Sequence, residues 1–468
     1  MAEKKADAPP AAGMLWGGRF TGAIDPLMHK YNASIQYDKA LYREDILGSI
    51  AFARANSKTG IISEDEFQAI ECGLLQVMEE WKQETFVIMP NDEDIHTANE
   101  RRLGEIIGKD TAGKLHTGRS RNEQVVCDMR MWLRDRIKEI DCQLVAFLKV
   151  TVARAESEID YLMPGYTHSQ RAQPVRWAHW LMAHAAAFKQ DLERLRQVFE
   201  RVNLSPLGCG ALAGNPFRIN RNAMAEELGF SGITFNSMNT SADRDFIIEF
   251  LTWNSIFTNH ISRWAEDLIV YGTSEFGFLR LADSYSTGSS LMPNKKNSDS
   301  LEILRGKSGR AFGQMAGLMM TMKGLPYCYA KDSQESWEPM LDSVEFVLDS
   351  LGIANGVITT LTVRPERMRA ALDMTMLATD VAEWLVRKGV PFREAHHISG
   401  RIVALSENTE VSMDQLTLEQ LQAIDSRFTA DITAAFKYES SVEAKSAPGG
   451  TSRSAVLGQI QELRAILD

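Results

Sequence analysis

The stretch from Asn122 to Met163 contains neither proline nor glycine. Its apolar residues recur at intervals of three and four positions, at Val126, Met129, Leu133, Ile137, Ile140, Leu144 and Leu148. This spacing is typical of one apolar stripe along an α-helix. At a rise of 1.5 Å per residue, such a helix would be about 60 Å long, which exceeds a compact domain and suits a rod in a helical bundle.

Three further stretches, 175–203, 242–271 and 299–323, have the same character, and each is bounded by proline or glycine. Strand-like alternation is almost absent, and Ser63 followed by Glu66 predicts the capping box of an earlier helix. We therefore predict an all-α fold with a central bundle of very long helices. Rods with more than one apolar stripe cannot bury them within one chain, so we expect self-association. A coiled-coil scaffold is the simplest alternative.

The predicted organisation has a terminal tail and three helical domains. The tail, "MAEKKADAPPAAG", is polar and rich in proline and alanine, without the apolar core of a signal peptide. The expected limits are a disordered N-terminal tail at 1–14, an N-terminal helical domain at 15–118, the long-helix bundle at 119–371, and a C-terminal helical domain at 372–468.

Charge and cysteine usage exclude several classes of protein. The net charge is 51 − 62 = −11, which argues against a nucleic-acid partner, although a few local cations could still hold a small anionic substrate. The five cysteines are scattered without a CxxC pair, so we expect a reducing compartment and no thiolate metal site. No apolar run reaches the length of a membrane span. We expect a cytoplasmic protein with no membrane partner.

Polar segments interrupt the helical sequence next to the long helices. In "HTGRSRN", Ser120, Arg121 and Asn122 precede or open a helix whose first backbone amides lack helical partners. Such a helix start can bind a carboxylate. The alternative is that these residues are only helix caps and surface charges.

The segment "YSTGSSLMPNKKNSDS" places hydroxyl groups, a glycine and lysines in a loop between helices. A phosphate-binding loop would need Gly-Lys-Ser/Thr after a strand, whereas Lys295 follows Asn294. Ser289 offers a hydroxyl on a glycine-flanked loop. Lys295 and Asn297 could stabilise a carboxylate on which negative charge develops.

His168, in "GYTHSQRAQP", is a candidate general acid or base, although a lone histidine is more often a hydrogen-bonded core residue. The other histidines form no metal-binding pattern, and HExxH does not occur, so we expect no metal. Residues that bind substrate carboxylates, together with a hydroxyl and an imidazole that transfer protons, suit removal of a proton from the carbon next to a carboxylate. That chemistry requires neither an acyl-transfer triad nor a cofactor.

The segment "GSSLMPNKKNSD" resembles the signature of the fumarase/aspartase superfamily. Other motifs resemble the argininosuccinate lyase family, which includes the eye-lens protein delta-crystallin. They are "LWGGRF", "NDEDIHTANERRL", "GKLHTGRSRN", "GYTHSQRAQP", "GALAGNP" and "MLATDVAEWLVRKG". The match runs in order from Leu15 to "GGTSRS" at 449–454.

The resemblance implies a homotetramer around a core of twenty helices, with three subunits contributing to each active site. It implies a carbon–nitrogen lyase that releases fumarate from an N-succinyl adduct. The implied proton-transfer pair is Ser289 and His168, with Glu302 hydrogen-bonded to His168, and Lys295 and Asn297 on the aci-carboxylate. The implied substrate-binding residues are Ser34, His96, Ser120, Arg121, Asn122, Thr167, Tyr329 and Gln334.

The chain departs from the family pattern at Glu123, Ser169, Asn294 and Ser298, and in "YCYAKDSQESWE" from Tyr327 to Glu338. Trp337 stands where the resemblance implies a lysine that contacts the amine half of the substrate. Three hypotheses follow: argininosuccinate cleavage in arginine biosynthesis, a sister lyase with another amine leaving group, and a non-enzymatic crystallin-like role. Under the second hypothesis, changing Ser336 to Asp and Trp337 to Lys should improve recognition of argininosuccinate.

Overall fold

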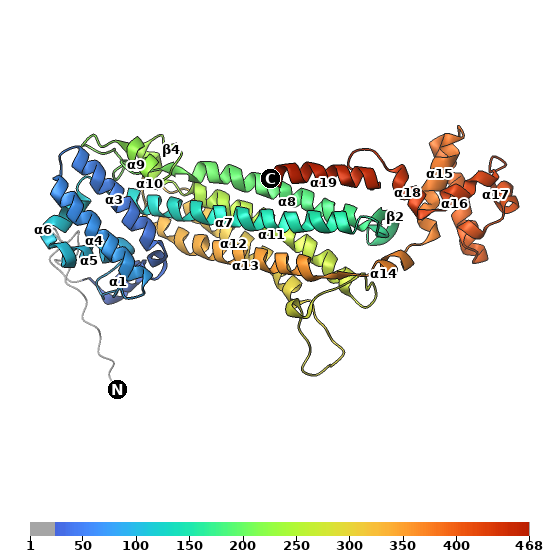
Figure 1. Cartoon of the computed structure of the whole chain (residues 1–468), viewed down its shortest axis with the longest axis horizontal. Helices are drawn as coiled ribbons and strands as arrows, with labels where there is room; N and C mark the ends of the chain where they lie inside the picture. Colours follow the sequence, from blue (N-terminus) through green and yellow to red (C-terminus); the bar gives the residue numbers. More distant parts are fainter. Residues whose placement is uncertain (1–23, 468) are drawn as a thin grey trace. The chain divides into compact units, whose positions relative to one another are not determined.

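The computed structural model describes residues 24–467, so the predicted tail at 1–14 and the "LWGGRF" motif lie outside the described residues. The described chain is mostly helical (Figure 1). It has five helices of 24 residues or more within that range. They are α7 (Arg121–Ser157), α8 (Trp177–Val202), α11 (Asp245–Gly272), α12 (Asp299–Met322) and α13 (Trp337–Thr360). The prediction of a helical fold with very long helices is confirmed.

The remaining helices are shorter. Those before α7 are α1 (Pro26–Asn32), α2 (Ile35–Asp38), α3 (Tyr42–Lys58), α4 (Glu64–Lys82), α5 (Ile95–Ile107) and α6 (Lys109–Ala112). Between α8 and α11 lie α9 (Arg221–Glu227) and α10 (Ser237–Ala242). After α13 come α14 (Pro365–Ala370), α15 (Ala378–Arg387), α16 (Phe392–Thr409), α17 (Leu418–Ile424), α18 (Tyr438–Ala444) and α19 (Arg453–Leu467). None of the helices formed by residues 24–467 is long and apolar enough to cross a bilayer.

The chain divides into two compact units, and each long helix contributes residues to both. Within the described residues, unit 1 comprises 24–141, 194–255 and 309–347, and unit 2 comprises 142–193, 256–308 and 348–467. These units are built from several chain segments, unlike the three predicted domains, which are continuous in sequence. The three-domain division remains a prediction.

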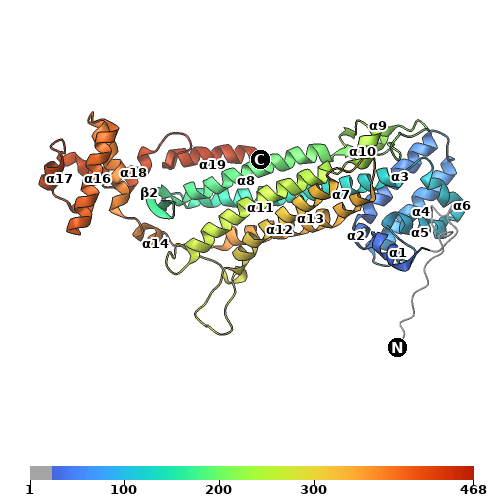
Figure 2. The ribbon, with the colours of Figure 1, turned by 180° about the vertical axis from the view of Figure 1, so that it is seen from behind.

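Unit 1 contains a helical cluster formed by α3, α4 and α5, which lie together in both views (Figures 1 and 2). Ile50, Phe67, Leu74 and Leu103 pack in its core. Helix α4 begins with the predicted capping box, in which the side chains of Ser63 and Glu66 each accept from the other's backbone amide. These two bonds satisfy amide donors that a helix start otherwise leaves unpaired.

Unit 2 contains a C-terminal cluster around α15 and α16, whose core includes Val381, Leu385, Ile398 and Ile402. The same unit holds the interior contact between Phe147 of α7 and Phe188 of α8. Their ring centroids lie 5.1 Å apart in an edge-to-face arrangement, a geometry that aromatic pairs favour.

The structure also contains strands that the sequence analysis did not predict. Strands β1 (Leu162–Thr167) and β2 (Gln170–Arg176) form an antiparallel hairpin. Helix α7 therefore ends at Ser157, before the Met163 limit of the predicted rod. Two short pairs complete the strands of the described chain: β3 (Leu204–Ser205) with β4 (Gly232–Ile233), and β5 (Leu279–Arg280) with β6 (Thr362–Val363).

The start of α13 explains one departure from the family pattern. Trp337 is only 3% exposed, and it begins a buried stripe that continues at helical spacing through Met340, Val344 and Val347. Ser336 is fully buried, and its hydroxyl donates to the Ser333 carbonyl at 2.6 Å. Both side chains therefore belong to the interior of unit 1.

We predict that the double change Ser336→Asp with Trp337→Lys destabilises the protein. It places two charges in an apolar interior, and an uncompensated buried charge typically costs on the order of 3–5 kcal/mol. Thermal unfolding should show a clear loss in melting temperature, whereas the conservative control Trp337→Phe should lose much less. An unchanged melting temperature for the double variant would contradict the interior placement.

Candidate active site

Four predicted site residues lie on or just after the loop between β5 and α12, which extends outward from unit 2 in both views (Figures 1 and 2). The backbones of Thr287 and Asn297 pair across its base, with N–H donors at 3.2 Å and 2.7 Å. The Asn297 side-chain amide also donates to the Gly288 carbonyl at 3.5 Å. Asn297 thus closes the loop at its base, while Ser289 and Lys295 lie further along it and Glu302 lies in the first turn of α12.

The Ser289 hydroxyl sits in a tight local turn. Its oxygen accepts from the backbone amides of Leu291 at 3.2 Å and Met292 at 3.0 Å. Amide donors aimed at an oxygen stabilise negative charge on it. The loop therefore provides local support for an ionised Ser289 hydroxyl.

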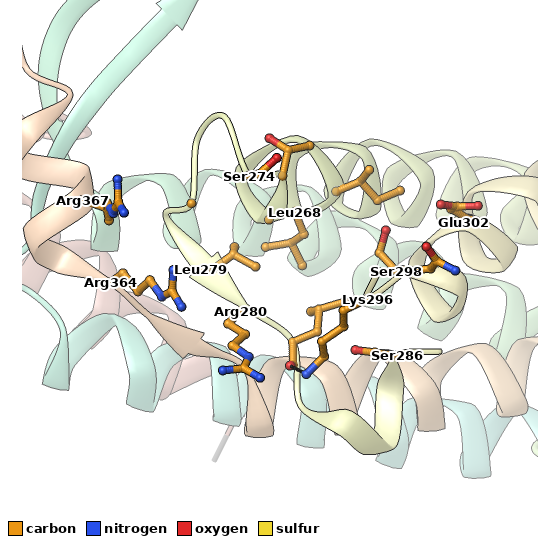
Figure 3. A pocket seen from close by; sticks show the side chains of 16 residues that line it. Leu268, Ser274, Leu279, Arg280, Ser286, Lys296, Ser298, Glu302, Arg364 and Arg367 are labelled. Carbon is orange, nitrogen blue, oxygen red and sulfur yellow. Dashed lines mark hydrogen bonds between the residues drawn. The ribbon is translucent and has the colours of Figure 1, made fainter. Parts of the chain in front are cut away.

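A cavity of about 600 Å³ lies beside this loop. Figure 3 shows the Lys296 and Glu302 side chains around it, together with Arg280, Arg364 and Arg367 from β5 and the segment that opens α14. Lys296 donates to the Leu281 carbonyl at 2.7 Å and to Asp283 at 2.5 Å. The predicted Lys295 is not among the residues that line this cavity. The sequence analysis did not identify the arginines, because they come from separate parts of the chain.

The β1–β2 hairpin holds Thr167 and His168 at its tip. Thr167 pairs with Gln170, so His168 and Ser169 form a two-residue turn, and their φ angles are 54° and 59°. Positive φ at both central residues is typical of a type I′ turn. The turn leaves His168 exposed in the single chain.

In unit 1, the start of α7 carries Ser120, Arg121 and Asn122. The Ser120 hydroxyl accepts from the Asn122 amide at 3.2 Å. Glu123 is fully buried, and its carboxylate accepts from the amides of Ser120 at 3.0 Å and Gly208 at 2.6 Å. Burial raises the pKa of Glu123, while its bonds to backbone amides lower it. Glu123 is therefore a structural cap of α7.

Ser34, Gln334 and Tyr329 also lie in unit 1. The Ser34 amide donates to the Glu93 carbonyl at 2.8 Å, and Gln334 donates to the Asn32 carbonyl at 3.2 Å. The pKa of the Tyr329 hydroxyl is raised, mainly by burial. The positive charge of Arg244 lowers this pKa, and the negative charge of Asp94 raises it.

Arg121 connects the start of α7 to the same neighbourhood. Its guanidinium lies 3.5 Å from the Asp94 carboxylate, which also acts on Tyr329. Unit 1 thus brings together residues predicted for the succinyl carboxylates and residues predicted for the amine half.

His96 is buried instead of lying at a surface. Its Nδ1 lies 2.7 Å from the Asp45 carboxylate and 3.5 Å from Asp128. These three residues are the group within 24–467 whose ligand atoms could hold a metal ion, all within 4.8 Å of one another. However, Asp45 is already engaged by Asn99 at 2.7 Å and Gln124 at 2.5 Å, which is the pattern of a hydrogen-bonded network. Direct contact between His96 and substrate remains a prediction.

The two groups of predicted residues fall in different units. Unit 1 holds Ser34, His96, Ser120, Arg121, Asn122, Tyr329 and Gln334, and unit 2 holds Thr167, His168, Ser289, Lys295, Asn297 and Glu302. In the described part of the chain, no hydrogen bond or ion pair joins His168 to Glu302. The predicted hydrogen bond between His168 and Glu302 is therefore not formed within one chain.

Comparisons with known proteins agree with the helical fold and the loop motifs. A family model described as "Lyase" matches residues 18–313, and one described as "Argininosuccinate lyase C-terminal" matches 375–443. A "Probable argininosuccinate lyase" of Schizosaccharomyces pombe is 58% identical, covering 97% of this chain and 99% of that protein. The "Argininosuccinate lyase" of Candida albicans is 54% identical, covering 98% and 99%.

Among solved structures, EDDS lyase in complex with formate superposes with a TM-score of 0.83 at 28% identity, covering 96% of this chain and 91% of that one. The helical fold and the signature loop define a lyase of the fumarase/aspartase type. Within that class, the chain belongs to the argininosuccinate lyase family.

Asp38 is hydrogen-bonded to Ser34 and offers a test of the surroundings of Ser34 in unit 1. Its carboxyl group is 1% exposed, shares a 2.6 Å hydrogen bond with the Ser34 hydroxyl, and accepts from the Ile95 amide at 3.1 Å. Burial, with smaller contributions from Asp94 and Asp45, raises the pKa of Asp38 from 3.8 to about 7, against the effect of the Ser34 and Ile95 hydrogen bonds. The folded protein therefore retains a proton that the unfolded chain has lost. The resulting stabilisation is full below pH 3.8 and is lost as pH rises through about 7.

We predict that Asp38→Asn, which mimics the protonated carboxyl group, gains stability relative to the wild type between pH 5 and pH 8.5. Each unit of pKa shift corresponds to about 1.4 kcal/mol, so the relative gain should reach at least about 1 kcal/mol. Melting temperatures across this range measure the difference, and Asp110→Asn, at an exposed position of unit 1, is the control. A difference for Asp38→Asn that does not change with pH would contradict the raised pKa.

Proposed function

We propose that this chain cleaves argininosuccinate to L-arginine and fumarate, as part of arginine biosynthesis. The observation that carries this proposal is the match over nearly the whole chain to relatives named argininosuccinate lyase. The C-terminal family model, which is specific to argininosuccinate lyase, supports the same assignment.

The reaction is a β-elimination. A base removes the proton from the carbon beside a succinyl carboxylate, and the electron pair moves into that carboxylate to form an aci-carboxylate. When this electron pair returns, it forms the carbon–carbon double bond as the carbon–nitrogen bond breaks. The departing nitrogen takes a proton. The products are fumarate and arginine.

In this mechanism Ser289 and His168 form the proton-transfer pair, and Glu302 orients His168. The amides of Leu291 and Met292 stabilise negative charge on the Ser289 oxygen, which favours Ser289 as the group that removes the proton.

Binding roles divide between the two halves of the substrate. Lys295 and Asn297 stabilise the aci-carboxylate, and the succinyl carboxylates are held by Ser120, Arg121, Asn122 and Thr167. The amine half is contacted by Ser34, Tyr329 and Gln334.

We also propose a homotetramer in which three subunits contribute to each site. Five long helices per chain would give the twenty-helix core. Helix α12 supports this assembly because Ile303, Phe312 and Met320 are more than 60% exposed in the single chain. A face with several exposed large apolar residues indicates an interaction surface.

The glycines of α12 point to the same surface. A Cβ atom added at Gly306, Gly309, Gly313 or Gly317 would meet no described atom within 4 Å. Glycine in a helix interior costs roughly 0.5–1 kcal/mol relative to alanine, so a run of glycines is best explained by the close approach of another helix.

The other two hypotheses have no supporting observation in the structure. The sister-lyase hypothesis rested on the cluster of departures around Tyr329 and Gln334, and two of these, Ser336 and Trp337, are buried parts of unit 1. Glu123, another departure, caps α7. A purely structural role would leave the supported Ser289 oxygen without a purpose.

We predict that the wild-type protein forms fumarate from argininosuccinate and that Ser289→Ala loses about 10²–10⁴-fold in kcat, the usual contribution of proton transfer. The ultraviolet absorbance of fumarate measures the rate. Ser284→Ala, which removes another exposed hydroxyl of the same segment, is the matched control and should retain activity. No fumarate from the wild type would refute the proposed function, and an active Ser289→Ala variant would refute the role of Ser289.

We predict complementation between His168→Asn and Ser289→Ala, each inactive alone. If each site takes His168 and Ser289 from different subunits, randomly mixed tetramers should recover up to about one quarter of the wild-type activity, because half of each contribution is intact. The subunits are mixed by denaturation and joint refolding, and each variant refolded alone is the control. Mixed tetramers without activity would mean that both residues come from the same subunit.

A further inference from the structure

A small polar cavity in unit 1 lies at the start of α11. Its volume is about 170 Å³, and its lining includes Asn239, Arg244, Asp245, Tyr327 and Ser333. Sites for complete drug-sized ligands typically occupy about 300–1,000 Å³. This cavity is therefore suited to one end of a substrate.

Arg244 is a buried cation without a carboxylate partner among the described residues. It is 2% exposed, and one of its terminal nitrogens donates to the Asp243 backbone carbonyl at 2.8 Å. Its Nε has no hydrogen-bond partner within residues 24–467. Of the two acids adjacent in sequence, Asp243 instead pairs with Arg130 at 2.6 Å. Burying a charge is costly unless it is paired, so the Arg244 guanidinium is poised to bind an external anion.

Asp245, the next residue, brings the opposite charge to the same cavity. No hydrogen bond or ion pair engages its carboxylate in the described part of the chain. Partial burial raises its pKa, and the neighbouring carboxylates of Asp243 and Glu249 raise it further. A cationic ligand group would relieve this excess of negative charge.

An unpaired cation and an unpaired anion in one small cavity match the zwitterionic end of an α-amino acid. The cavity also lies close to the proposed contacts for the amine half, because its lining includes Cys328 and Ser333, which are adjacent in sequence to Tyr329 and Gln334. We infer that Arg244 binds the α-carboxylate, and Asp245 the α-ammonium, of the arginine half of argininosuccinate. This inference rests on the proposed function and adds two residues to the recognition of the leaving group.

These contacts lie away from the bond that breaks, so they should act equally on the bound substrate and on the transition state. Loss of such uniform binding raises KM and leaves kcat nearly unchanged. A residue that only supports the fold would instead lower the melting temperature without a specific effect on KM.

The first measurement is steady-state cleavage of argininosuccinate by Arg244→Gln and Asp245→Asn. Each variant should raise KM by about tenfold or more, with kcat within about threefold of the wild type. Asp110→Asn is the exposed acidic control and should leave both constants unchanged. Melting temperatures identify a variant that has lost its fold. If Arg244→Gln unfolds, the exposed Asp245→Asn decides the outcome.

The second measurement separates the two charges by calorimetric titration with three ligands. L-arginine has both groups, agmatine lacks the α-carboxylate, and Nα-acetylarginine lacks the α-ammonium. The wild type should bind L-arginine at least about tenfold more tightly than either analogue, or about 1.4 kcal/mol. The Arg244→Gln variant should no longer prefer L-arginine to agmatine. The Asp245→Asn variant should no longer prefer L-arginine to Nα-acetylarginine.

These outcomes distinguish the inference from the proposed function. A wild type that forms no fumarate refutes the function, while its preference among the three ligands still tests the cavity. A wild type that forms fumarate, with folded variants that keep both KM and ligand preferences, overturns the assignment of Arg244 and Asp245.

Discussion

The hydrogen-bond network around the buried carboxylate of Asp45 is the interaction on which the organisation of unit 1 depends. It accepts from Gln124 of α7 at 2.5 Å and from Asn99 of α5 at 2.7 Å, and the His96 ring lies at 2.7 Å. One side chain of α3 thus connects the start of the longest helix to the helix that follows Asp94. Since breaking a buried network leaves charged and polar groups unpaired, this connection fixes where Ser120, Arg121 and Asn122 can lie.

Three of the proposed binding residues share a position in the secondary structure, because they lie at the starts of long helices. Asn122 lies in the first turn of α7, Arg244 directly precedes α11, and Asn297 lies just before α12. A helix start presents unpaired amide donors and the positive end of the helix dipole. A substrate with several carboxylates benefits from such starts, and the rigid rods behind them hold the donors in place. Long helices therefore contribute to binding as well as to the core.

The sequence predicted the rods well, because a period of three and four residues without proline or glycine leaves few alternatives. The predicted helices at 175–203 and 299–323 begin or end within about two residues of α8 and α12, close to the usual uncertainty of helix limits. The β1–β2 hairpin escaped prediction because Pro164 and Pro174 face each other across it and Gly165 accompanies a register shift. These residues hide the alternation that indicates a strand.

The sequence indicated which residues belong to the site, but it did not indicate how those residues are buried or paired. The family resemblance named His96 and drew attention to Trp337, yet only the structure shows that both are buried. The "SADRDF" segment held no signal that Arg244 lacks a carboxylate partner, because that property depends on Asp243 pairing with Arg130, which lies more than 100 positions earlier in the chain. Unpaired charge is a property of packing, and a linear pattern does not record it.

The same reasoning explains how the chain tolerates Trp337. A lysine there would supply a positive charge from the start of α13, whereas the indole extends the apolar stripe of Met340 and Val344. Loss of that charge need not abolish recognition of an α-carboxylate, because the cavity at the start of α11 already contains an unpaired guanidinium. The cost of burying the Arg244 guanidinium is offset when the carboxylate binds. Selectivity for the amine half then depends on the charges of Arg244 and Asp245 at the start of α11, while the start of α13 contributes to the core.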